Sequence, residues 1–524
     1  MASAATLKGA TQGGSPDATA VIIPSPRGPD AALTASYRRL AADVSAFQAK
    51  LAALGITHGS AVSIATVNSY EFIVSFLAAS WQRAVAAPLN PAYKQAEFEF
   101  YIEDVGSAVV LVPRGAFDAA SPAVKAARRF NAAIAECYWD DGKGEVALDV
   151  KDYGLLKGKG GQQVLEPQPD DVALVLHTSG TTSRPKVVPL THRNLTRTMN
   201  NIKNTYKLTP ADRTMLVMPL FHVHGLLCGL LAPLYTGGSM VVPTKFSATD
   251  FWRDFAAHGA NWYTAVPTIH QILLKHPAPN PLPQIRFIRS CSSPLSPTAF
   301  AQLEAAFKAP VLEAYAMTEA AHQMTSNPLP EVGKRKPGSV GVGQGVEVRI
   351  LDDKGDELAQ GSEGEICIRG ENVTKGYLNN TEANAGAFTK GGFFRTGDQG
   401  KMDEDGYLVI TGRIKELINK AGEKISPIEL DNVLTRHPAV SEAVSFAIPD
   451  DMYGQEVAVA IVLKPGAKLS QDELRAWVAD KLAKFKVPKK IYFTDVMPKT
   501  ATGKIQRRIV AEEMQKQDSK KAKL

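Results

Sequence analysis

The chain has 524 residues, of which 59 are Lys or Arg and 53 are Asp or Glu, so its formal net charge is +6. The last 26 residues carry eight basic and three acidic side chains, and the remaining body is nearly neutral. This excludes a protein that is basic over its whole surface, as a dedicated nucleic-acid binder is. A hydrophobic content of 44% excludes wholesale disorder, and the length predicts about three or four compact units.

Strands and helices alternate through the first 290 residues. Residues 1–16 are small and polar, and we expect them to be flexible. From Tyr37 to Leu54, apolar residues recur at spacings of three and four, which predicts an amphipathic helix that ends at Gly55. A second helix is predicted over 71–79. Short apolar runs predict strands at 109–112, 172–176, 215–218, 240–242 and 286–288. This alternation predicts an α/β chain with largely parallel sheets.

The pattern changes after residue 345. Segments 346–350 and 365–369 alternate apolar and polar residues, which predicts a small antiparallel, β-barrel-like section. After Gly412 a compact α+β pattern begins, with a helix capped by Ser470 and Glu473. We therefore expect a large domain over 17–412, a smaller one over 413–510 and a basic tail over 511–524.

One segment has the composition of a phosphate-binding loop. It follows a buried strand directly and combines hydroxyls, a glycine and a lysine: Thr178, Ser179, Gly180, Thr181, Thr182, Ser183 and Lys186. Backbone N–H groups and hydroxyls in such a loop can bind phosphate oxygens. It is not a Walker A loop, because the Gly-x4-Gly-Lys spacing is absent. The alternative is an ordinary surface turn.

Three further segments are weaker when each is considered alone. Thr318 and Glu319 offer a hydroxyl and one carboxylate, which suits Mg²⁺ beside phosphate oxygens. Asp398, followed by Arg413, could accept hydrogen bonds from a ribose diol. Lys504 lies in a loop near the end of the chain, where a lysine is normally solvated.

Taken together and in this order, the four segments resemble the adenylate-forming superfamily of acyl-CoA synthetases, luciferases and peptide-synthetase adenylation domains. The resemblance covers residues 17–510. Segments 222–225, 286–292 and 317–322 are similar to those of the oxalate–CoA ligase group of fungi and plants. The resemblance implies the adenylate-forming fold with a mobile small domain. It also implies a reaction in which ATP activates a carboxylate to an acyl-adenylate, and the acyl group is then transferred to coenzyme A.

The resemblance also implies roles for individual residues. The loop 178–186 would hold the β- and γ-phosphates, and Glu319 would bind Mg²⁺ with Thr181 or Thr318 nearby. Asp398 would hold the ribose with Arg413 beside it, and Ala314 and Tyr315 would flank the adenine. Lys504 would bridge the substrate carboxylate and the α-phosphate. The catalytic set is therefore Lys504, Glu319 and Thr181.

The resemblance further implies a substrate pocket and a hinge. Oxalate would leave one carboxylate unreacted, and the candidates to hold it are His222, Ser292 and His322, with Arg289 as a charge partner or a support for the loop. Lys415 lies where these families place their hinge, and Gly422, Glu423 and Lys424 would face coenzyme A. Two residues depart from the superfamily pattern, because Val187 and Ala421 replace glycines.

Two other functions remain as alternatives. The first is a ligase for medium-chain or aryl carboxylates such as hydroxycinnamates, and the second is nucleic-acid binding through the basic tail. The chain ends in Ala522-Lys523-Leu524, a near variant of the Ser-Lys-Leu peroxisomal signal. This ending predicts binding to the peroxisomal import receptor and a peroxisomal location, with the cytosol as a further possibility. No stretch is long and apolar enough to predict a membrane span.

Overall fold

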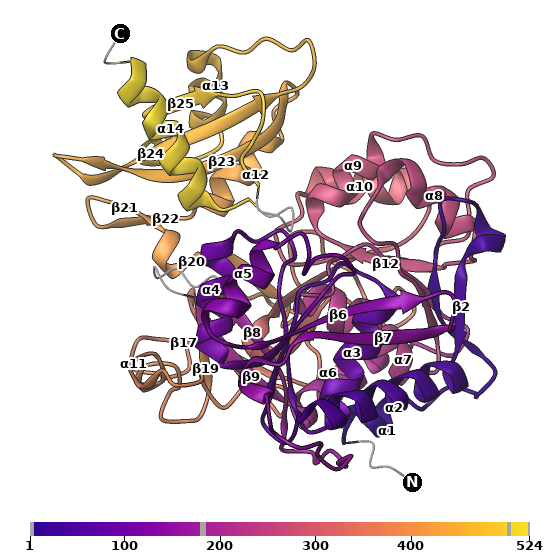
Figure 1. Ribbon diagram of the computed structural model, residues 1–524. Coiled ribbons are helices and arrows are strands. Elements are labelled where there is room, and N and C mark those ends of the chain that lie inside the picture. The colour runs from indigo at the N-terminus through magenta and orange to yellow at the C-terminus, as the bar shows by residue number, and fades with distance from the viewer. Residues whose placement is uncertain (1–4, 179–184, 500–504, 522–524) are drawn as a thin grey trace.

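Two sheets with parallel centres form the body of the large domain (Figure 1). The computed structural model describes residues 5–178, 185–499 and 505–521. The first sheet has nine strands in the order β16-β15-β14-β13-β12-β10-β11-β1-β2. They are β1 (Thr19–Ile23), β2 (Leu33–Ser36), β10 (Arg213–Leu216), β11 (Ser239–Val241), β12 (Trp262–Ala265), β13 (Phe287–Ser290), β14 (Val311–Met317), β15 (His322–Ser326) and β16 (Val342–Gly343). Strands β1 and β10 to β14 pair in parallel, and both edges are antiparallel.

The second sheet has seven strands in the order β7-β6-β5-β3-β4-β8-β9. They are β3 (Ala61–Ile64), β4 (Val85–Pro88), β5 (Ser107–Val112), β6 (Ala133–Asp140), β7 (Glu145–Asp152), β8 (Val172–Thr178) and β9 (Lys186–Thr191). Its inner pairs are parallel, and β7 and β9 are antiparallel edges. The predicted α/β class with largely parallel sheets is confirmed.

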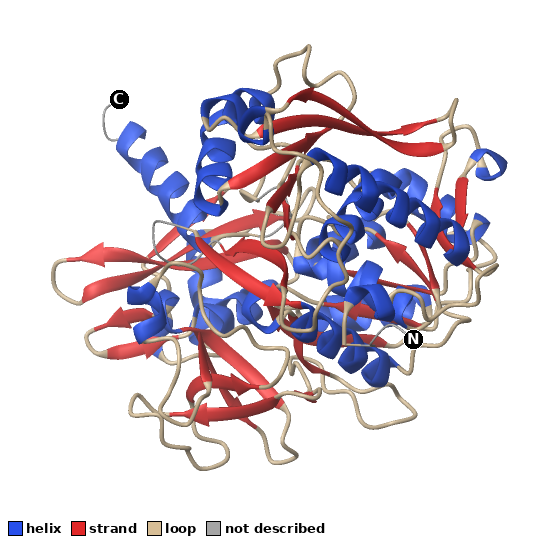
Figure 2. Cartoon of the chain, turned by 60° about the horizontal axis from the view of Figure 1, so that its bottom comes forward, coloured by secondary structure: helices blue, strands red, loops and turns tan. Residues whose placement is uncertain are grey.

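Helices surround these sheets and fill the space between them (Figure 2). The large domain contains α1 (Leu7–Ala10), α2 (Tyr37–Leu54), α3 (Tyr70–Trp81), α4 (Gln95–Val105), α5 (Pro122–Arg129), α6 (His192–Tyr206), α7 (Ala232–Tyr235), α8 (Ala248–Ala257), α9 (Pro267–Leu274), α10 (Pro297–Phe307) and α11 (Thr381–Ala385). Short helical turns are η1 (Pro29–Ala31), η2 (Gly154–Leu156), the π-helical η3 (His224–Leu231), and η4 (Thr318–Ala320). Helix α3 is apolar all round and buried on nearly every residue, as expected for a helix inside the core.

The predicted helix at Tyr37 is confirmed, because α2 spans Tyr37–Leu54 and ends at Gly55, whose φ of 102° closes the helix in the left-handed region. The strand predicted at 215–218 begins two residues earlier, as β10 (Arg213–Leu216).

The N-terminal segment differs from the expectation of flexibility. Helix α1 places Leu7 in the largest core cluster with no exposed surface. The backbone N–H of Leu7 donates to Nδ1 of His192, 3.1 Å away and 185 residues later in the chain. Residues 1–4 lie outside the described part. The expectation was therefore wrong for residues 5–11, because a distant histidine and an apolar surface hold this short helix.

A four-stranded antiparallel sheet links the two domains, with the order β17 (Glu347–Leu351), β18 (Gly364–Arg369), β19 (Phe394–Met402) and β20 (Leu408–Arg413). Within these described strands β17 does not pair with β20, so the section is an open sheet rather than a closed barrel. Beyond β20 the chain passes through η5 (Ile414–Glu416) into the small domain.

The small domain lies above the large one in Figure 1 and has its own core. Its elements are β21 (Ile418–Lys420), β22 (Glu423–Ile425), α12 (Pro427–Thr435), β23 (Val440–Asp450), β24 (Gly454–Leu463), α13 (Gln471–Ala479), η6 (Lys484–Lys486), β25 (Lys490–Phe493) and α14 (Arg507–Lys521). The expected tail over 511–524 is partly wrong. Helix α14 continues to Lys521, and Met514 is fully buried beside Val510. Val510 and Met514 of this helix pack in a core cluster with Val444 and Phe446, which holds the helix against the small domain despite its many charges.

Candidate active site

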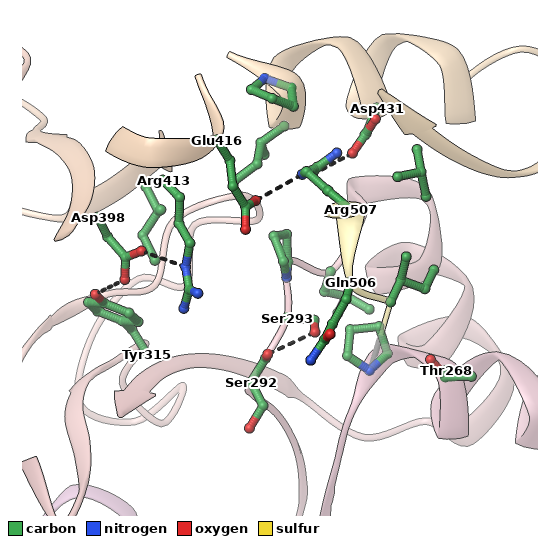
Figure 3. Close-up of a pocket in the computed structure, with 18 of the residues that line it drawn as sticks. Thr268, Ser292, Ser293, Tyr315, Asp398, Arg413, Glu416, Asp431, Gln506 and Arg507 are labelled. Atoms are coloured by element: carbon green, nitrogen blue, oxygen red, sulfur yellow. Dashed lines mark hydrogen bonds and ion pairs between the residues drawn. The ribbon is translucent and has the colours of Figure 1, made fainter. Parts of the chain in front are cut away.

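A large cavity of about 2260 Å³ lies between the two domains (Figure 3). The end of β8, the segment from β14 into η4, and β19 contribute from the large domain. The small domain contributes Gln506 and Arg507. All of the residues predicted to bind ATP or Mg²⁺ that the structure describes line this one space: Thr178, Lys186, Ala314, Tyr315, Thr318, Glu319, Asp398 and Arg413.

The β8–β9 hairpin, which carries the predicted phosphate-binding loop, contributes Thr178 and Lys186 to the cavity. Thr178 ends β8 and pairs with Lys186, the first residue of β9. Within the described residues, the buried Thr178 hydroxyl has no hydrogen-bond partner, which leaves it available to a phosphate oxygen. The predicted residues Ser179, Gly180, Thr181, Thr182 and Ser183 lie outside the described part of the chain. Val187 is a regular, buried β9 residue opposite His177, so glycine is not required there.

Glu319, which was predicted to bind Mg²⁺, is a buried carboxylate of the cavity. Its side chain lines the cavity in η4, and its Oε1 accepts a hydrogen bond from the Tyr377 hydroxyl at 2.8 Å. Burial raises the pKa of Glu319, and the Tyr377 hydrogen bond and the Lys186 charge oppose this shift. Among the described residues no three His, Cys, Asp or Glu side chains cluster as a metal site. One carboxylate beside a hydroxyl and phosphates fits Mg²⁺ better than zinc.

Three side chains that were predicted around the ribose and the adenine contact one another (Figure 3). The Tyr315 hydroxyl donates to Oδ2 of Asp398, and Nε of Arg413 donates to Oδ1 at 3.1 Å. Asp398 and Arg413 are paired across β19 and β20. Burial raises the pKa of Asp398, and the charge and hydrogen bond of Arg413 oppose this shift. The sequence analysis placed Arg413 beside Asp398, and the register of β19 and β20 explains why they meet. Tyr315 was expected at the adenine and also contacts Asp398.

A polar wall closes another part of the cavity. His222, Ser292 and His322 line it, whereas Arg289 lies behind it with no exposed surface. Within the described residues no carboxylate pairs with Arg289. Ser292 and His322 have φ angles of 73° and 100°, in the left-handed region. Such backbone strain in non-glycine residues is typical of functional sites.

Arg289 reaches this wall through hydrogen bonds. Its Nη1 donates to Oγ1 of Thr264 at 3.1 Å, and Oγ1 lies 2.6 Å from Nε2 of His224. Because Oγ1 accepts from the guanidinium, its own hydrogen can be donated to Nε2 of His224. This places the ring proton on Nδ1, which lies 3.1 Å from Oγ of Ser292. The Ser292 hydroxyl hydrogen is then available to a ligand.

Two residues of this site were missed in the sequence analysis. His224 lies in the segment 222–225, but the residue predicted to hold the unreacted carboxylate was His222, two residues earlier. Tyr377 was not singled out at all, because nothing close in the chain relates it to Glu319. The His-x-His pattern of residues 222–224 was the sequence signal for His224.

The parts predicted to move are only partly in the cavity. Lys415 lines it, and so do Ile505 and Gln506, which directly follow the undescribed Lys504. Gly422, Glu423 and Lys424 are exposed and do not line it. Ala421, at the turn between β21 and β22, has a φ of 51°.

Arg507 links the residue after Lys415, which was predicted to be the hinge, to the segment that follows Lys504. Its Nη2 lies 2.6 Å from Oδ2 of Asp431, and its Nε lies 3.3 Å from Oε2 of Glu416, the residue after Lys415 (Figure 3). An ion pair thereby joins Glu416 to Arg507, the first residue of α14.

The described helices include none that is both long and apolar enough to cross a membrane.

Known proteins resemble the chain over nearly its whole length. The AMP-binding enzyme family matches residues 10–378, and the AMP-binding enzyme C-terminal domain matches residues 429–504. An oxalate–CoA ligase of Saccharomyces cerevisiae is 53% identical, with 88% of each chain covered. An oxalate–CoA ligase of Arabidopsis thaliana is 51% identical, with 87% of this chain and 89% of that one covered. The crystal structure of ATP-bound MatB from Rhodopseudomonas palustris superposes with a TM-score of 0.87 at 30% identity, covering 97% of this chain and 98% of that chain.

Proposed function

We propose that this chain, which belongs to the family of AMP-binding enzymes, joins oxalate to coenzyme A in two steps driven by ATP. An oxalate oxygen first bonds to the α-phosphorus, and pyrophosphate leaves. The coenzyme A sulfur then bonds to the activated carbonyl carbon, AMP leaves and the thiol gives up its proton. The products are oxalyl-CoA, AMP and pyrophosphate.

The hydrogen-bond chain from Arg289 through Thr264 and His224 to Ser292 is the observation that supports oxalate as the substrate. A buried cation without a carboxylate partner is costly, and an incoming anion at the wall offsets that cost. Oxalate is small enough for one carboxylate to contact Ser292 and His322 while the other meets ATP. The names and the identity of the two oxalate–CoA ligase relatives support the same substrate.

The nucleotide residues supply the rest of the reaction. Thr178, Lys186 and the loop between them would hold the β- and γ-phosphates, and Asp398 would hold the ribose. Glu319 would hold Mg²⁺, which would neutralise phosphate charge when bound. The carboxylate is already ionised at neutral pH, so the first step requires no general base. The main barrier is repulsion between two anions, which a cationic Lys504 would lower.

A substrate panel tests this proposal. Pyrophosphate release is measured with oxalate, malonate, hexanoate and 4-coumarate at equal concentrations. We expect oxalate to give the highest kcat/KM. If hexanoate or 4-coumarate exceeds oxalate, the medium-chain or aryl alternative replaces the oxalate assignment.

We also propose a peroxisomal location through Ala522-Lys523-Leu524, which lie outside the described residues. Their similarity to Ser-Lys-Leu supports recognition by the import receptor. A fluorescent protein fused before residue 1 should mark peroxisomes, and deletion of Leu524 should move it to the cytosol. Peroxisomal fluorescence that survives the deletion contradicts this signal.

The same proposal includes the domain plan, with a hinge at Lys415 and a boundary near residue 412. The passage from the β17–β20 sheet into a separate sheet, across η5, supports this boundary. Rotation about Lys415 would bring the turn at 421–424 towards the cavity for the second step.

A further inference from the structure

The segment after β18 connects two halves of the nucleotide site. The backbone N–H of Thr374 donates to the carbonyl oxygen of Glu319 at 2.7 Å, and the Thr374 hydroxyl donates to the carbonyl oxygen of Pro189 at 2.8 Å. The N–H of Leu378 donates to the carbonyl oxygen of Val187 at 3.0 Å. Residues 374–378 therefore hold η4, which carries Glu319, at a fixed place relative to β9, which begins at Lys186.

Tyr377 is fixed within this segment. Its backbone N–H donates to Oδ1 of Asn384 at 2.7 Å, and Nδ2 of Asn384 donates to its carbonyl oxygen at 2.8 Å. Its ring packs edge-on against Phe394, with centroids 6.3 Å apart. A side chain held at both its backbone and its ring can orient a neighbour without much loss of entropy.

The Tyr377 side chain contacts both charged residues of the site. Its hydroxyl donates to Oε1 of Glu319 at 2.8 Å, and Nζ of Lys186 lies 4.6 Å from the centroid of its ring. One rigid group thus separates the phosphate-binding cation from the carboxylate. Direct pairing of Lys186 with Glu319 would neutralise both, and among the described residues they form no ion pair.

We propose that Tyr377 is the positioning residue that aims Glu319 at Mg²⁺ and Lys186 at the phosphates. The hydroxyl occupies one lone pair of Oε1, so Oε2 would be the oxygen of Glu319 that holds Mg²⁺. The ring face holds the ammonium group by cation–π attraction, so it does not collapse onto the carboxylate. Partners of metal-binding carboxylates commonly change metal affinity 10- to 100-fold. This inference rests on the proposed nucleotide site, not on the identity of the acid.

The test separates the hydroxyl from the ring. Mn²⁺ binding is measured by electron paramagnetic resonance with a non-hydrolysable ATP analogue present, and analogue binding is measured separately by calorimetry without metal. In Tyr377→Phe we expect Mn²⁺ to bind about 10-fold more weakly and metal-free analogue binding to be nearly unchanged. In Tyr377→Leu we expect both to weaken, because Lys186 loses the ring face.

Tyr407 offers a matched control. Its ring lies 4.6 Å from Nζ of Lys336, and its hydroxyl donates to the carbonyl oxygen of Lys334, but it does not line the cavity. Tyr407→Phe should leave Mn²⁺ affinity unchanged. Asn384→Ala, which touches neither charged residue, should weaken Mn²⁺ binding in the same direction as Tyr377→Phe.

Equal Mn²⁺ affinity, within twofold, in Tyr377→Phe and the wild-type protein overturns the proposal. If the wild-type protein binds Mn²⁺ with the analogue but does not activate oxalate, the substrate assignment fails and the role of Tyr377 is judged by these affinities alone.

Discussion

The imidazole rings of His224 and His322 stack with their centroids 5.3 Å apart and their planes at 26°. His224 is held from behind by Thr264 and Ser292, whereas His322 lines the cavity. The stack fixes His322 by contact with a ring that is itself hydrogen-bonded. A side chain oriented in this way can bind a small anion with little reorganisation.

Replacing His322 with alanine tests the polar wall. A hydrogen bond to a charged group is worth about 1.5–3 kcal/mol. We therefore expect kcat/KM for oxalate to fall about 10- to 100-fold, with the KM for ATP within threefold of wild type. A value of kcat/KM within a factor of two of the wild-type value refutes a role for His322 in oxalate binding.

Ser292 is the last group of the hydrogen-bond chain from Arg289. Ser292→Ala should lower kcat/KM for oxalate by at least about 10-fold. Ser293→Ala is the control, since the Ser293 hydroxyl donates to the Ser292 carbonyl oxygen at 2.7 Å. It should change kcat/KM less than threefold. Similar losses in both variants would show that loop structure, not the Ser292 hydroxyl, matters.

Lys504→Ala should separate the two half-reactions. Adenylation, measured as the exchange of pyrophosphate into ATP, should nearly disappear. The repulsion between the carboxylate and the phosphate is then no longer offset. Thioester formation from supplied oxalyl-adenylate should remain within about threefold of wild type. Equal losses in both steps are inconsistent with the role proposed for Lys504.

Much of this arrangement could be predicted locally, and the exceptions depend on contacts distant in sequence. The helix from Tyr37 to Leu54 follows from apolar spacing alone. The burial of Leu7 does not, because its hydrogen-bond partner His192 lies on another element. His224 and His222 have similar sequence surroundings, and only the fold turns His224 towards Thr264. Tyr377 meets Glu319 through an irregular loop between β18 and α11 that no short pattern reveals.

Ala421 stands in the left-handed region, at a cost of about 1–2 kcal/mol for a residue with a Cβ atom. Ala421→Gly removes that strain but adds chain entropy to the unfolded state. We expect the free energy of unfolding of the small domain to rise by up to about 1 kcal/mol. Ala421→Val should lower it, because β-branched residues fit this region worst. Urea titration of both variants and the wild-type protein checks this order of stability. An Ala421→Gly variant less stable than the wild-type protein would contradict the prediction.

Acidification should weaken the N-terminal anchor. Burial lowers the pKa of His192 from 6.5 to about 4, so between these values the unfolded chain binds more protons than the folded one. The stability that depends on neutral His192 is complete above pH 6.5 and is lost as the pH falls towards 4. From pH 7 to pH 5 the loss is about 2 kcal/mol.

His192→Asn measures this contribution, since it keeps an acceptor for the Leu7 N–H but does not titrate. Urea unfolding at pH 7 and pH 5 should show about 2 kcal/mol less pH dependence in the variant. The same pH dependence in both proteins rules out His192 as the source.

Arg413 donates a hydrogen bond to Asp398, which would hold the ribose, and it lies two residues before Lys415. The nucleotide pocket is therefore built onto the fixed end of the proposed pivot. A bound ribose would hold Asp398 and Arg413 in place next to the proposed hinge while the small domain rotates. Dissociation of AMP would make the residues beside the hinge more mobile. The release of the nucleotide and the rotation of the small domain would then be coupled directly.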